Sequence, residues 1–356
     1  MAATQIYHSL LGKIRHLIPA GHIYRERNMA WMMTGVYLSK SVHLSKIANK
    51  LPGKALRESR EQRFRRFLKN AAVQVRDWYR PMAVALLQEA AQTGEIRLII
   101  DATKVTAHHQ LLMVALAYRR RALPIAWTWT RKPRGHSSGS KQVALLSYVK
   151  TLIPQKTRVI LIGDSEFTPL QCAVESWGWL FVFRQKGSHL FRQQEEGSWQ
   201  RLDTLVSEPG QLRWLLDVQL TQEHQHRCNL LAWWKPEENE PWLLATNLPS
   251  SRLTKRYYNA RMWVDEMFGD LKSNGFDLER SRLWHVSRLS RLTLVVALLY
   301  VWLVAFGSAV IKNGRRKEVD RVRKRTLSIF RIGYDMLERY LINHWTPSIR
   351  DIPYFT

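Results

Sequence analysis

The feature that most constrains the fold is a run of twenty residues without a charged side chain, from Leu292 to Ile311. That length is sufficient for a helix to cross a lipid bilayer. It is equally typical of a helix that is buried on all sides at the centre of a large domain. A single membrane span beside so much polar, basic sequence would be unusual. We therefore expect a core helix around which the rest of the chain packs and no membrane partner, with a membrane protein anchored by this segment as the alternative.

The charge balance points to a polyanionic partner. The chain has 55 Lys and Arg against 29 Asp and Glu, a net charge of +26 and a pI near 10.4. Basic residues run from Lys13 to Arg350, which indicates a folded body with a basic surface rather than a basic tail. DNA, RNA and anionic membrane all fit such a surface.

The cysteines and the N-terminus indicate a compartment. Cys172 and Cys228 show neither metal-ligand spacing nor a disulfide framework. The N-terminus lacks the basic-then-apolar order of a signal peptide. A reducing cytoplasm fits both observations.

The first 90 or so residues read as helical. Residues Val42–Leu56 carry apolar residues at helical spacing until Pro52-Gly53 breaks the pattern. Residues Glu58–Asn70 are dense in arginine, including Arg63 and Arg66. Two short helices around a turn, the second basic, predict either a DNA-binding helix-turn-helix or a helical bundle with a solvated basic face.

The pattern changes to strands after Gln92-Thr93-Gly94. Three apolar runs come first, then a polar loop over Arg131–Ser140 that either follows a phosphate backbone or is simply solvated. A helix, a continuous apolar strand, a second helix and another strand follow. The predicted strands are Ile96–Ile100, Leu111–Tyr118, Leu123–Thr130, Val159–Ile162 and Leu180–Phe183, and the predicted helices are Lys141–Ile153 and Pro169–Trp177.

Two aspartates follow apolar strands in this region. Asp101 comes after the first run and Asp164 after the fourth. In open α/β sheets the functional crevice lies beyond strand ends, so neighbouring strands would bring the two carboxylates together. Carboxylates that close repel each other unless a cation lies between them. Each aspartate taken alone is equally well explained as a turn residue.

Residues 190 to 250 read as short strands separated by turns at Glu208-Pro209-Gly210 and Lys235–Glu240. Beyond the apolar helix, Lys312–Lys324 is predicted to form a basic helix that contacts DNA or a second subunit. The predicted strands are Trp199–Val206, Leu212–Leu220, Cys228–Trp234 and Trp242–Ala245.

The stretch Tyr258–Lys272 is predicted to be a helix that ends at Asn274-Gly275. At about 100° per residue, Arg261 lies near 300°, Asp265 near 340° and Lys272 near 320° from Tyr258. One stripe therefore carries a phenol, a guanidinium, a carboxylate and an ammonium. Such a stripe suits a site for a phosphodiester and a metal ion. The alternative is an exposed ion pair between Arg261 and Asp265.

The spacing Tyr, two residues, Arg, three residues, acid, six residues, Lys resembles the signature of the insertion-sequence-four (IS-four) family of DDE transposases. The resemblance implies a mixed α/β sheet of RNase H-like type flanked by helices, and it covers roughly residues 95 to 310. It divides the chain into a helical DNA-binding domain (1–92), a first part of the core (93–189), a β-strand insertion (190–250), a second part of the core with the motif helix and the buried helix (251–311) and a basic C-terminal region (312–356).

The family's acid in this signature is Glu, whereas the matching position here is Asp265 and the next residue is Glu266. Asp265 lies about 20° from Lys272 on the helical count and Glu266 about 120° from it. Geometry therefore favours Asp265 as the third acid. Residue type favours Glu266, because its extra methylene gives reach and a local bulge would rotate it inward.

The resemblance implies two-metal phosphoryl transfer, with two Mg²⁺ ions, or Mn²⁺, held by Asp101, Asp164 and Asp265. Arg261 and Lys272 would neutralise phosphate charge and Tyr258 would bond a phosphate oxygen. Trp242 would stack on a base flipped from the DNA end, with Trp233 and Trp234 as rivals and core packing as the alternative.

The expected function is cut-and-paste transposition through a hairpin, by a homodimer on terminal inverted repeats and target DNA in the bacterial cytoplasm, associated with the nucleoid. An inactive DNA-binding descendant of a transposase and a nuclease without joining activity are the alternatives.

Overall fold

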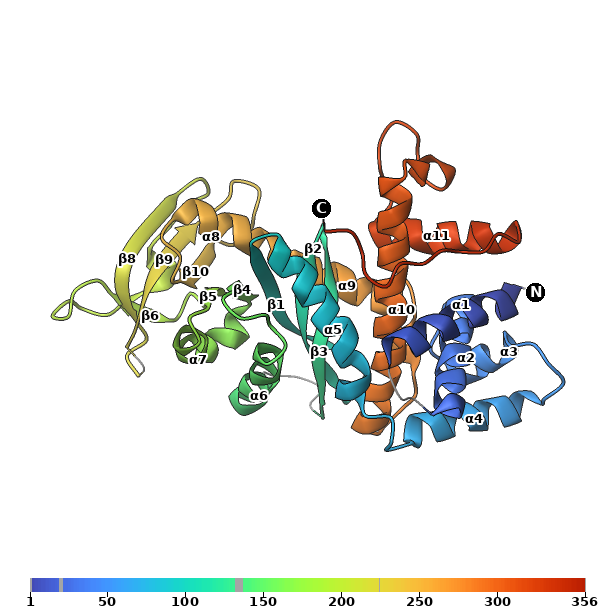
Figure 1. The fold of residues 1–356 in the computed structure, drawn as a ribbon. Helices are drawn as coiled ribbons and strands as arrows, with labels where there is room; N and C mark the ends of the chain where they lie inside the picture. Colours follow the sequence, from blue (N-terminus) through green and yellow to red (C-terminus); the bar gives the residue numbers. More distant parts are fainter. Residues whose placement is uncertain (1, 19–21, 132–136, 224, 356) are drawn as a thin grey trace.

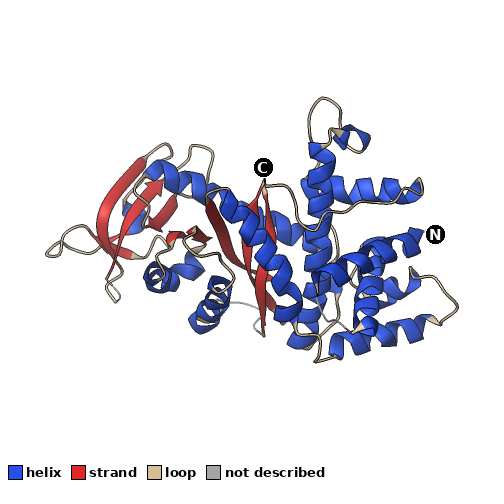
Figure 2. Ribbon diagram, viewed as in Figure 1, coloured by secondary structure: helices blue, strands red, loops and turns tan. Residues whose placement is uncertain are grey.

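A ten-stranded mixed sheet runs through the molecule, with helices packed against it and a group of helices at one end (Figures 1 and 2). The computed structural model describes residues 2–18, 22–131, 137–223 and 225–355. Residues 132–136 of the predicted polar loop therefore lie outside the described residues. The strand order is β3-β2-β1-β4-β5-β10-β9-β8-β6-β7.

The first five strands place the site. They are β1 (Glu95–Lys104), β2 (Gln110–Tyr118), β3 (Arg121–Thr130), β4 (Arg158–Gly163) and β5 (Leu180–Arg184). β1, β4 and β5 are parallel, and β1, β2 and β3 form an antiparallel meander. Val159 to Ile162 of β4 are buried, as expected for a parallel strand covered on both faces. Helix α6 (Gly139–Lys150) connects β3 to β4, and a 3₁₀ turn η1 (Ser165–Leu170) with helix α7 (Gln171–Ser176) connects β4 to β5.

The stretch from 190 to 250 continues the same sheet. β10 (Trp242–Thr246) pairs antiparallel with β5, and β9 (His226–Trp233) and β8 (Leu212–Leu220) follow outward. At the outer edge lie β6 (Leu190–Arg192), which the sequence did not indicate, and β7 (Gln200–Arg201). The predicted strand Trp199–Val206 was wrong, because only two of its residues pair. The 3₁₀ turn η2 (Leu202–Thr204) ends it directly afterwards.

The uncharged run lies in α10 (Val286–Lys312), a 27-residue helix. By length and composition alone α10 is able to cross a membrane, but 89% of its most apolar 18-residue window is buried inside the protein. It packs against β3, α2, α4, α5 and α11. Trp302 and Tyr300 are at most 1% exposed. This burial agrees with the core-helix interpretation.

Among the described residues, five helices precede the sheet: α1 (Ala2–Leu17), α2 (Ile23–Ser39), α3 (Leu44–Asn49), α4 (Arg57–Lys69) and α5 (Val75–Gln92). The break at Pro52-Gly53 falls between α3 and α4, and Gly53 adopts the left-handed backbone with φ 109°. Apolar residues of α1 to α4 belong to the same buried core as the sheet and α10.

The C-terminal helix α11 (Ile329–Ile342) crosses α10 at two glycines. A Cβ on Gly307 would overlap the carbonyl oxygen of Ile329, and a Cβ on Gly333 would overlap that of Leu303. The predicted basic helix Lys312–Lys324 was wrong. Gly314 takes φ 71° and ends α10, and a short 3₁₀ turn η5 (Arg315–Glu318) and an irregular loop follow.

The motif stretch is not one continuous α-helix, which corrects the prediction for Tyr258–Lys272. Helix α8 (Ser251–Tyr258) passes through a 3₁₀ turn η3 (Asn259–Met262) into α9 (Trp263–Leu271). A 3₁₀ turn advances about 120° per residue rather than 100°, so the predicted position of Tyr258 relative to the other three side chains does not hold. The remaining short element is the 3₁₀ turn η4 (Leu278–Arg280).

Candidate active site

Asp101 and Asp164 lie side by side because their strands are parallel neighbours. Ile100 of β1 is paired with Gly163 of β4, so the residue that follows each of them along the chain is one of the two acids. Asp101 lies inside β1 rather than after it, because β1 extends to Lys104. Its side chain is only 9% exposed. Asp164 caps the 3₁₀ turn η1, where Oδ1 accepts a hydrogen bond from the Ser165 amide.

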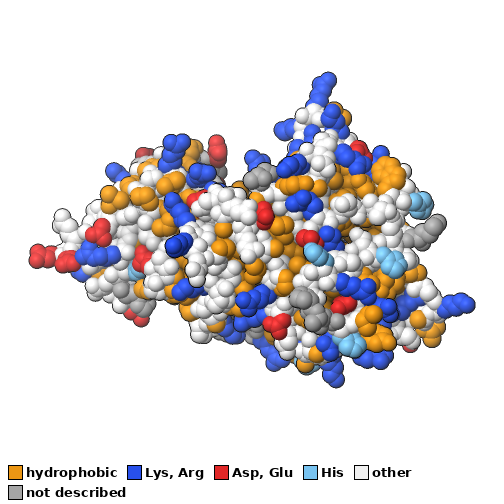
Figure 3. Space-filling view, viewed as in Figure 1, with side chains coloured by type: hydrophobic (Ala, Val, Ile, Leu, Met, Phe, Trp, Pro, Cys, Tyr) orange, Lys and Arg blue, Asp and Glu red, His pale blue; other side chains and the backbone are white. Residues whose placement is uncertain are grey.

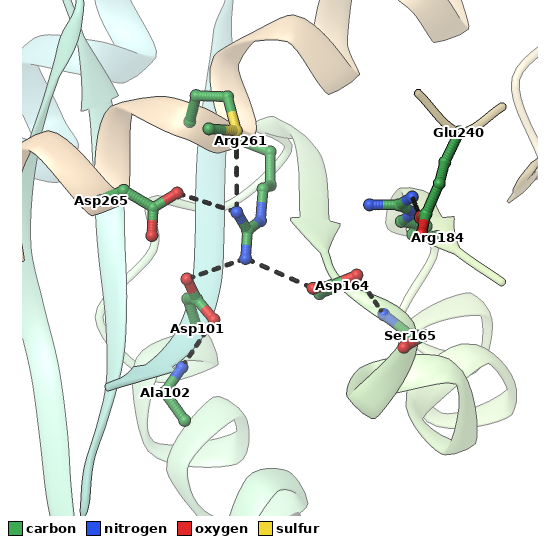
Figure 4. A network of polar contacts seen from close by, with 9 residues as sticks. Asp101, Ala102, Asp164, Ser165, Arg184, Glu240, Arg261 and Asp265 are labelled. Carbon is green, nitrogen blue, oxygen red and sulfur yellow. Dashed lines mark hydrogen bonds and ion pairs between the residues drawn. The ribbon is translucent and has the colours of Figure 1, made fainter. Parts of the chain in front are cut away.

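Arg261 lies at the centre of three carboxylates that come from separate elements (Figure 4). Its Nη2 is 3.3 Å from Asp101 Oδ2 and 3.4 Å from Asp164 Oδ2. Its Nη1 is 2.8 Å from Oδ2 of Asp265, one turn along the chain. The Arg261 side chain is 17% exposed. One half-buried cation thus holds together three of the four acids that the sequence indicated.

Burial sets the protonation of this cluster. Desolvation raises the pKa of Asp101 to about 7, although the charge of Arg261 opposes the shift. Desolvation also raises the pKa of Asp265, again against the effect of Arg261. Burial by itself would lower the pKa of Arg261, but Asp101, Asp265 and Asp164 raise it. Three acids around one cation leave the cluster with an excess of negative charge when all are ionised.

Asp265 and Glu266 point to different places. Asp265 faces Asp101 and Asp164 through Arg261, whereas Glu266 is more than half exposed and pairs with Arg121 of β3 at 2.8 Å. Arg121 also lies 2.9 Å from Asp270, one turn further along α9. Glu266 therefore belongs to a second ion-pair cluster, and the geometry places Asp265 with the two strand acids.

The aromatic and lysine candidates are already packed. Tyr258 is buried and lies edge-on to Trp242, with ring centroids 4.8 Å apart. The ammonium of Lys235 is 3.7 Å from the ring centroid of Trp242. Trp233 meets the same ring edge-on at 5.6 Å. Lys272 Nζ donates to Thr103 Oγ1 at 2.7 Å, next to the acid cluster. A base that stacks on Trp242 would have to replace Lys235.

A cavity of about 450 Å³ adjoins Asp164. Its lining includes Ser165, Arg184, Lys186 and Gly187, none of which the sequence reading picked out. Arg184 ends β5, the strand next to β4, and pairs with Glu240 at 3.1 Å. A polar residue at the end of an apolar strand was the sequence signal that identified Asp164. Arg184, at the end of β5, carries the same signal.

Arg63 and Arg66 lie elsewhere, in a groove between α2 and α4. The groove has a volume of about 610 Å³, and Tyr24, Arg25 and Arg60 are also among its lining. Tyr24 is 66% exposed. Arg60 is used structurally, because its guanidinium donates to the carbonyl oxygens of Ala48, Leu51 and Gly53. The groove is a second basic surface in its own right.

The donor chemistry of Asp101, Asp164 and Asp265 suits Mg²⁺, which prefers carboxylate oxygens supplemented by water and substrate oxygens. In the described part of the chain, however, no three His, Cys, Asp or Glu side chains are grouped as metal ligands. The guanidinium of Arg261 stands between the three carboxylates.

The chain matches no protein-family model and no curated protein. Among solved structures it is similar to a piggyBac transposase, in a cryo-EM structure of its synaptic complex with hairpin DNA. The two chains are 12% identical with a TM-score of 0.46, over 100% of this chain and 85% of that one. A similarity of this size assigns neither fold family nor function.

Proposed function

We propose that this protein is a DDE transposase of the IS-four type, which cuts the ends of a DNA element and joins them to target DNA by metal-dependent phosphoryl transfer. The observation that carries the proposal is the convergence of Asp101, Asp164 and Asp265 on Arg261. The element order supports it too. Three strands, helix, strand, helix and strand is the element order of an RNase H-like fold.

Asp101, Asp164 and Asp265 would hold the ions, two Mg²⁺ or Mn²⁺, and a divalent cation so bound stabilises the charge of attacking and leaving phosphate oxygens. The partly exposed carboxylates of Asp164 and Asp265 open toward a phosphodiester, while Asp101 is fixed inside β1. Arg261 and Lys272 bring positive charge to the phosphate. Lys186 lines the adjoining cavity and would extend that charge along the strand being cut, whereas Arg184 beside it is paired with Glu240.

The partner is double-stranded DNA, both the terminal inverted repeats and the target, and the working form is a homodimer on DNA. The net charge of +26 supports a polyanion of this kind. The protein would work on the nucleoid of a bacterial cytoplasm. Trp242 would stack on a base at the hairpin end once Lys235 has moved from the face of its ring, and Tyr258 would bond a phosphate oxygen. Arg63 and Arg66 would contact the repeat through the α2–α4 groove.

The test is purified protein with a labelled duplex that carries the end of its own element, incubated with Mg²⁺ or with EDTA. We expect cleavage at the element end only with metal, a hairpin product, and joining to a second duplex. Asp101→Asn and Asp164→Asn should each abolish the cleavage. Cleavage that survives either substitution contradicts the proposal.

The product pattern separates the two rival functions. Cleavage without hairpin or joined product supports a nuclease of the same construction. Tight binding without cleavage supports an inactive DNA-binding descendant, for which the Asp at position 265 in place of the family's Glu is the first explanation to examine.

A further inference from the structure

A further basic cleft lies away from both the acid cluster and the α2–α4 groove. It is formed by the β2–β3 turn and by the loop that leads into α11, and it has a volume of about 360 Å³. The turn contributes three consecutive arginines and the loop a fourth. The charged lining residues are Arg119, Arg120, Arg121 and Arg325.

Three of these four arginines have no acidic partner in the described part of the chain. Arg121 pairs with Glu266 and Asp270. Arg119 lies only over the ring of Tyr118, with 5.6 Å between guanidinium carbon and ring centroid. Arg325 uses its Nε to donate to the carbonyl oxygen of Leu327 at 3.0 Å. Desolvation and the nearby charges of Arg121 and Arg120 lower the pKa of Arg325, whereas Asp320 opposes the shift. Cations grouped in this way repel one another until an anion neutralises them.

The backbone conformation of the turn is unfavourable for arginine. Arg119 has φ 42° and Arg120 has φ 67°, so two successive residues with a Cβ occupy the left-handed region. Hairpin turns with two positive φ values favour Asn-Gly, and a left-handed residue with a Cβ costs roughly 1–2 kcal/mol. Two arginines at the least suitable positions of a tight turn indicate that their charge serves a purpose other than forming the turn.

The facing loop is built to hold its own basic residues in place. Residues 315–325 include seven basic and two acidic side chains. Both acids form their hydrogen bonds and ion pairs with residues of the C-terminal region itself. Asp320 accepts from Arg316 at 2.9 Å and from the Thr326 hydroxyl at 2.8 Å, and Glu318 pairs with Arg315 and Arg339. Lysine and arginine side chains accordingly gather on the segment that projects beyond α10, at the top of the view in Figure 3.

We propose that this cleft binds the phosphate backbone of the same duplex that enters the acid cluster. The proposal rests on the proposed function for its choice of DNA. Asp101 is paired with Met113 of β2, five residues before Tyr118 at the turn. Five residues of strand span about 17 Å, which equals about five base-pair steps of 3.4 Å. One duplex is therefore long enough to contact the acids and the arginines together.

The decisive variant is Arg119→Asn with Arg120→Gly, which removes two charges and installs the residues that the turn prefers. Binding to a fluorescent duplex of about 20 base pairs is followed by anisotropy in EDTA over roughly 50–200 mM salt. Each phosphate contact contributes about 0.9 to the slope of log K against log salt. We expect the slope to fall by up to about 1.8 in the double variant and by about 0.9 in Arg325→Gln.

The matched control is Lys150→Gln with Arg213→Gln, two exposed residues of α6 and β8 that carry the same total charge. The control should leave the slope at the wild-type value. The double variant should melt at or above the wild-type temperature, because Asn-Gly suits the turn. Arg325→Gln lies outside the turn and provides the same slope test if the double variant melts lower.

Unchanged slopes in the double variant and in Arg325→Gln overturn the proposal. A second result also overturns it: pyrophosphate raises the melting temperature of the wild type but not of the double variant, while the DNA slopes of the two proteins are equal. That result would assign the cleft to small phosphate anions. Because these measurements need neither metal nor cleavage, they fail independently of the proposed catalytic function.

Discussion

Arg261→Gln tests whether this arginine occupies the place that a divalent cation would take. In the metal-free protein the substitution leaves Asp101, whose side chain is 9% exposed, without its cation. Removing one partner of a buried pair costs about 3–5 kcal/mol. We take about 3 kcal/mol, because Asp164 and Asp265 are 35% and 44% exposed and water solvates them in part. At about 2 °C per kcal/mol for a large domain, the melting temperature in EDTA should fall by about 6 °C.

Mg²⁺ should reverse most of that loss. A ligand at a hundred times its Kd adds about 2.7 kcal/mol of stability. In the wild type, Mg²⁺ must displace Arg261 from the carboxylates, which reduces the net stabilisation. In Arg261→Gln no such displacement is needed. The shift in melting temperature between EDTA and saturating Mg²⁺ should therefore be larger in the variant than in the wild type, by several degrees. Differential scanning fluorimetry measures both shifts.

Arg121→Gln is the matched control, because Arg121 is 14% exposed and also pairs with two carboxylates, Glu266 and Asp270. It should lose stability in EDTA and gain no more from Mg²⁺ than the wild type. Equal Mg²⁺ shifts in all three proteins, or a wild-type melting temperature for Arg261→Gln in EDTA, would show that Arg261 does not compete with metal.

Three further predictions concern other residues. Asp265→Asn should reduce metal-dependent cleavage at least a hundredfold, roughly the effect of losing about 2.7 kcal/mol of transition-state stabilisation, whereas Glu266→Gln should keep most of the rate; full activity in Asp265→Asn refutes the assignment of the third acid. Desolvation raises the pKa of Asp270 to about 7, so its carboxyl reduces stability progressively as pH rises from about 4 to about 7 and no further above that. Denaturant titrations should therefore find Asp270→Asn close to wild-type stability near pH 4 and more stable by up to about 4 kcal/mol at neutral pH, and a pH-independent difference contradicts this. Gly307→Ala should destabilise the protein by roughly 1–3 kcal/mol or more through overlap with α11, whereas Gly12→Ala on the open face of α1 should be neutral or stabilising; equal melting temperatures for the two variants argue against the close crossing.

The sequence predicted best where a residue's neighbours are set by strand order. Asp101 and Asp164 could be paired in advance through the family resemblance, which implies that their strands are neighbours, and the strand-end rule then brings the two carboxylates together. Helical spacing offered an ion pair between Arg261 and Asp265 as the alternative to a site, and in the structure Arg261 Nη1 lies 2.8 Å from Asp265 Oδ2.

Side chains whose partners come from distant segments could not be placed. The pairing of Glu266 with Arg121 depends on how α9 lies across β3, which no local pattern encodes. The 3₁₀ turn at Asn259–Met262 was missed because nothing in its composition distinguishes it from an α-helix. The end of α10 at Asn313-Gly314 was a visible signal, and the basic residues beyond it were wrongly read as a continuation of the helix.

The pairing of β5 with β10 has a consequence for synthesis on the ribosome. β5 ends at Arg184, and its partner on that side ends at Thr246, 62 residues later. At about 5–20 residues per second, the ribosome needs roughly 3–12 s to deliver that partner. During this interval the apolar edge of β5, with Phe181 and Phe183, has no strand to cover it. Nascent chains of this protein therefore pass through a stage at which a chaperone, or another nascent chain, competes with β10 for the same edge.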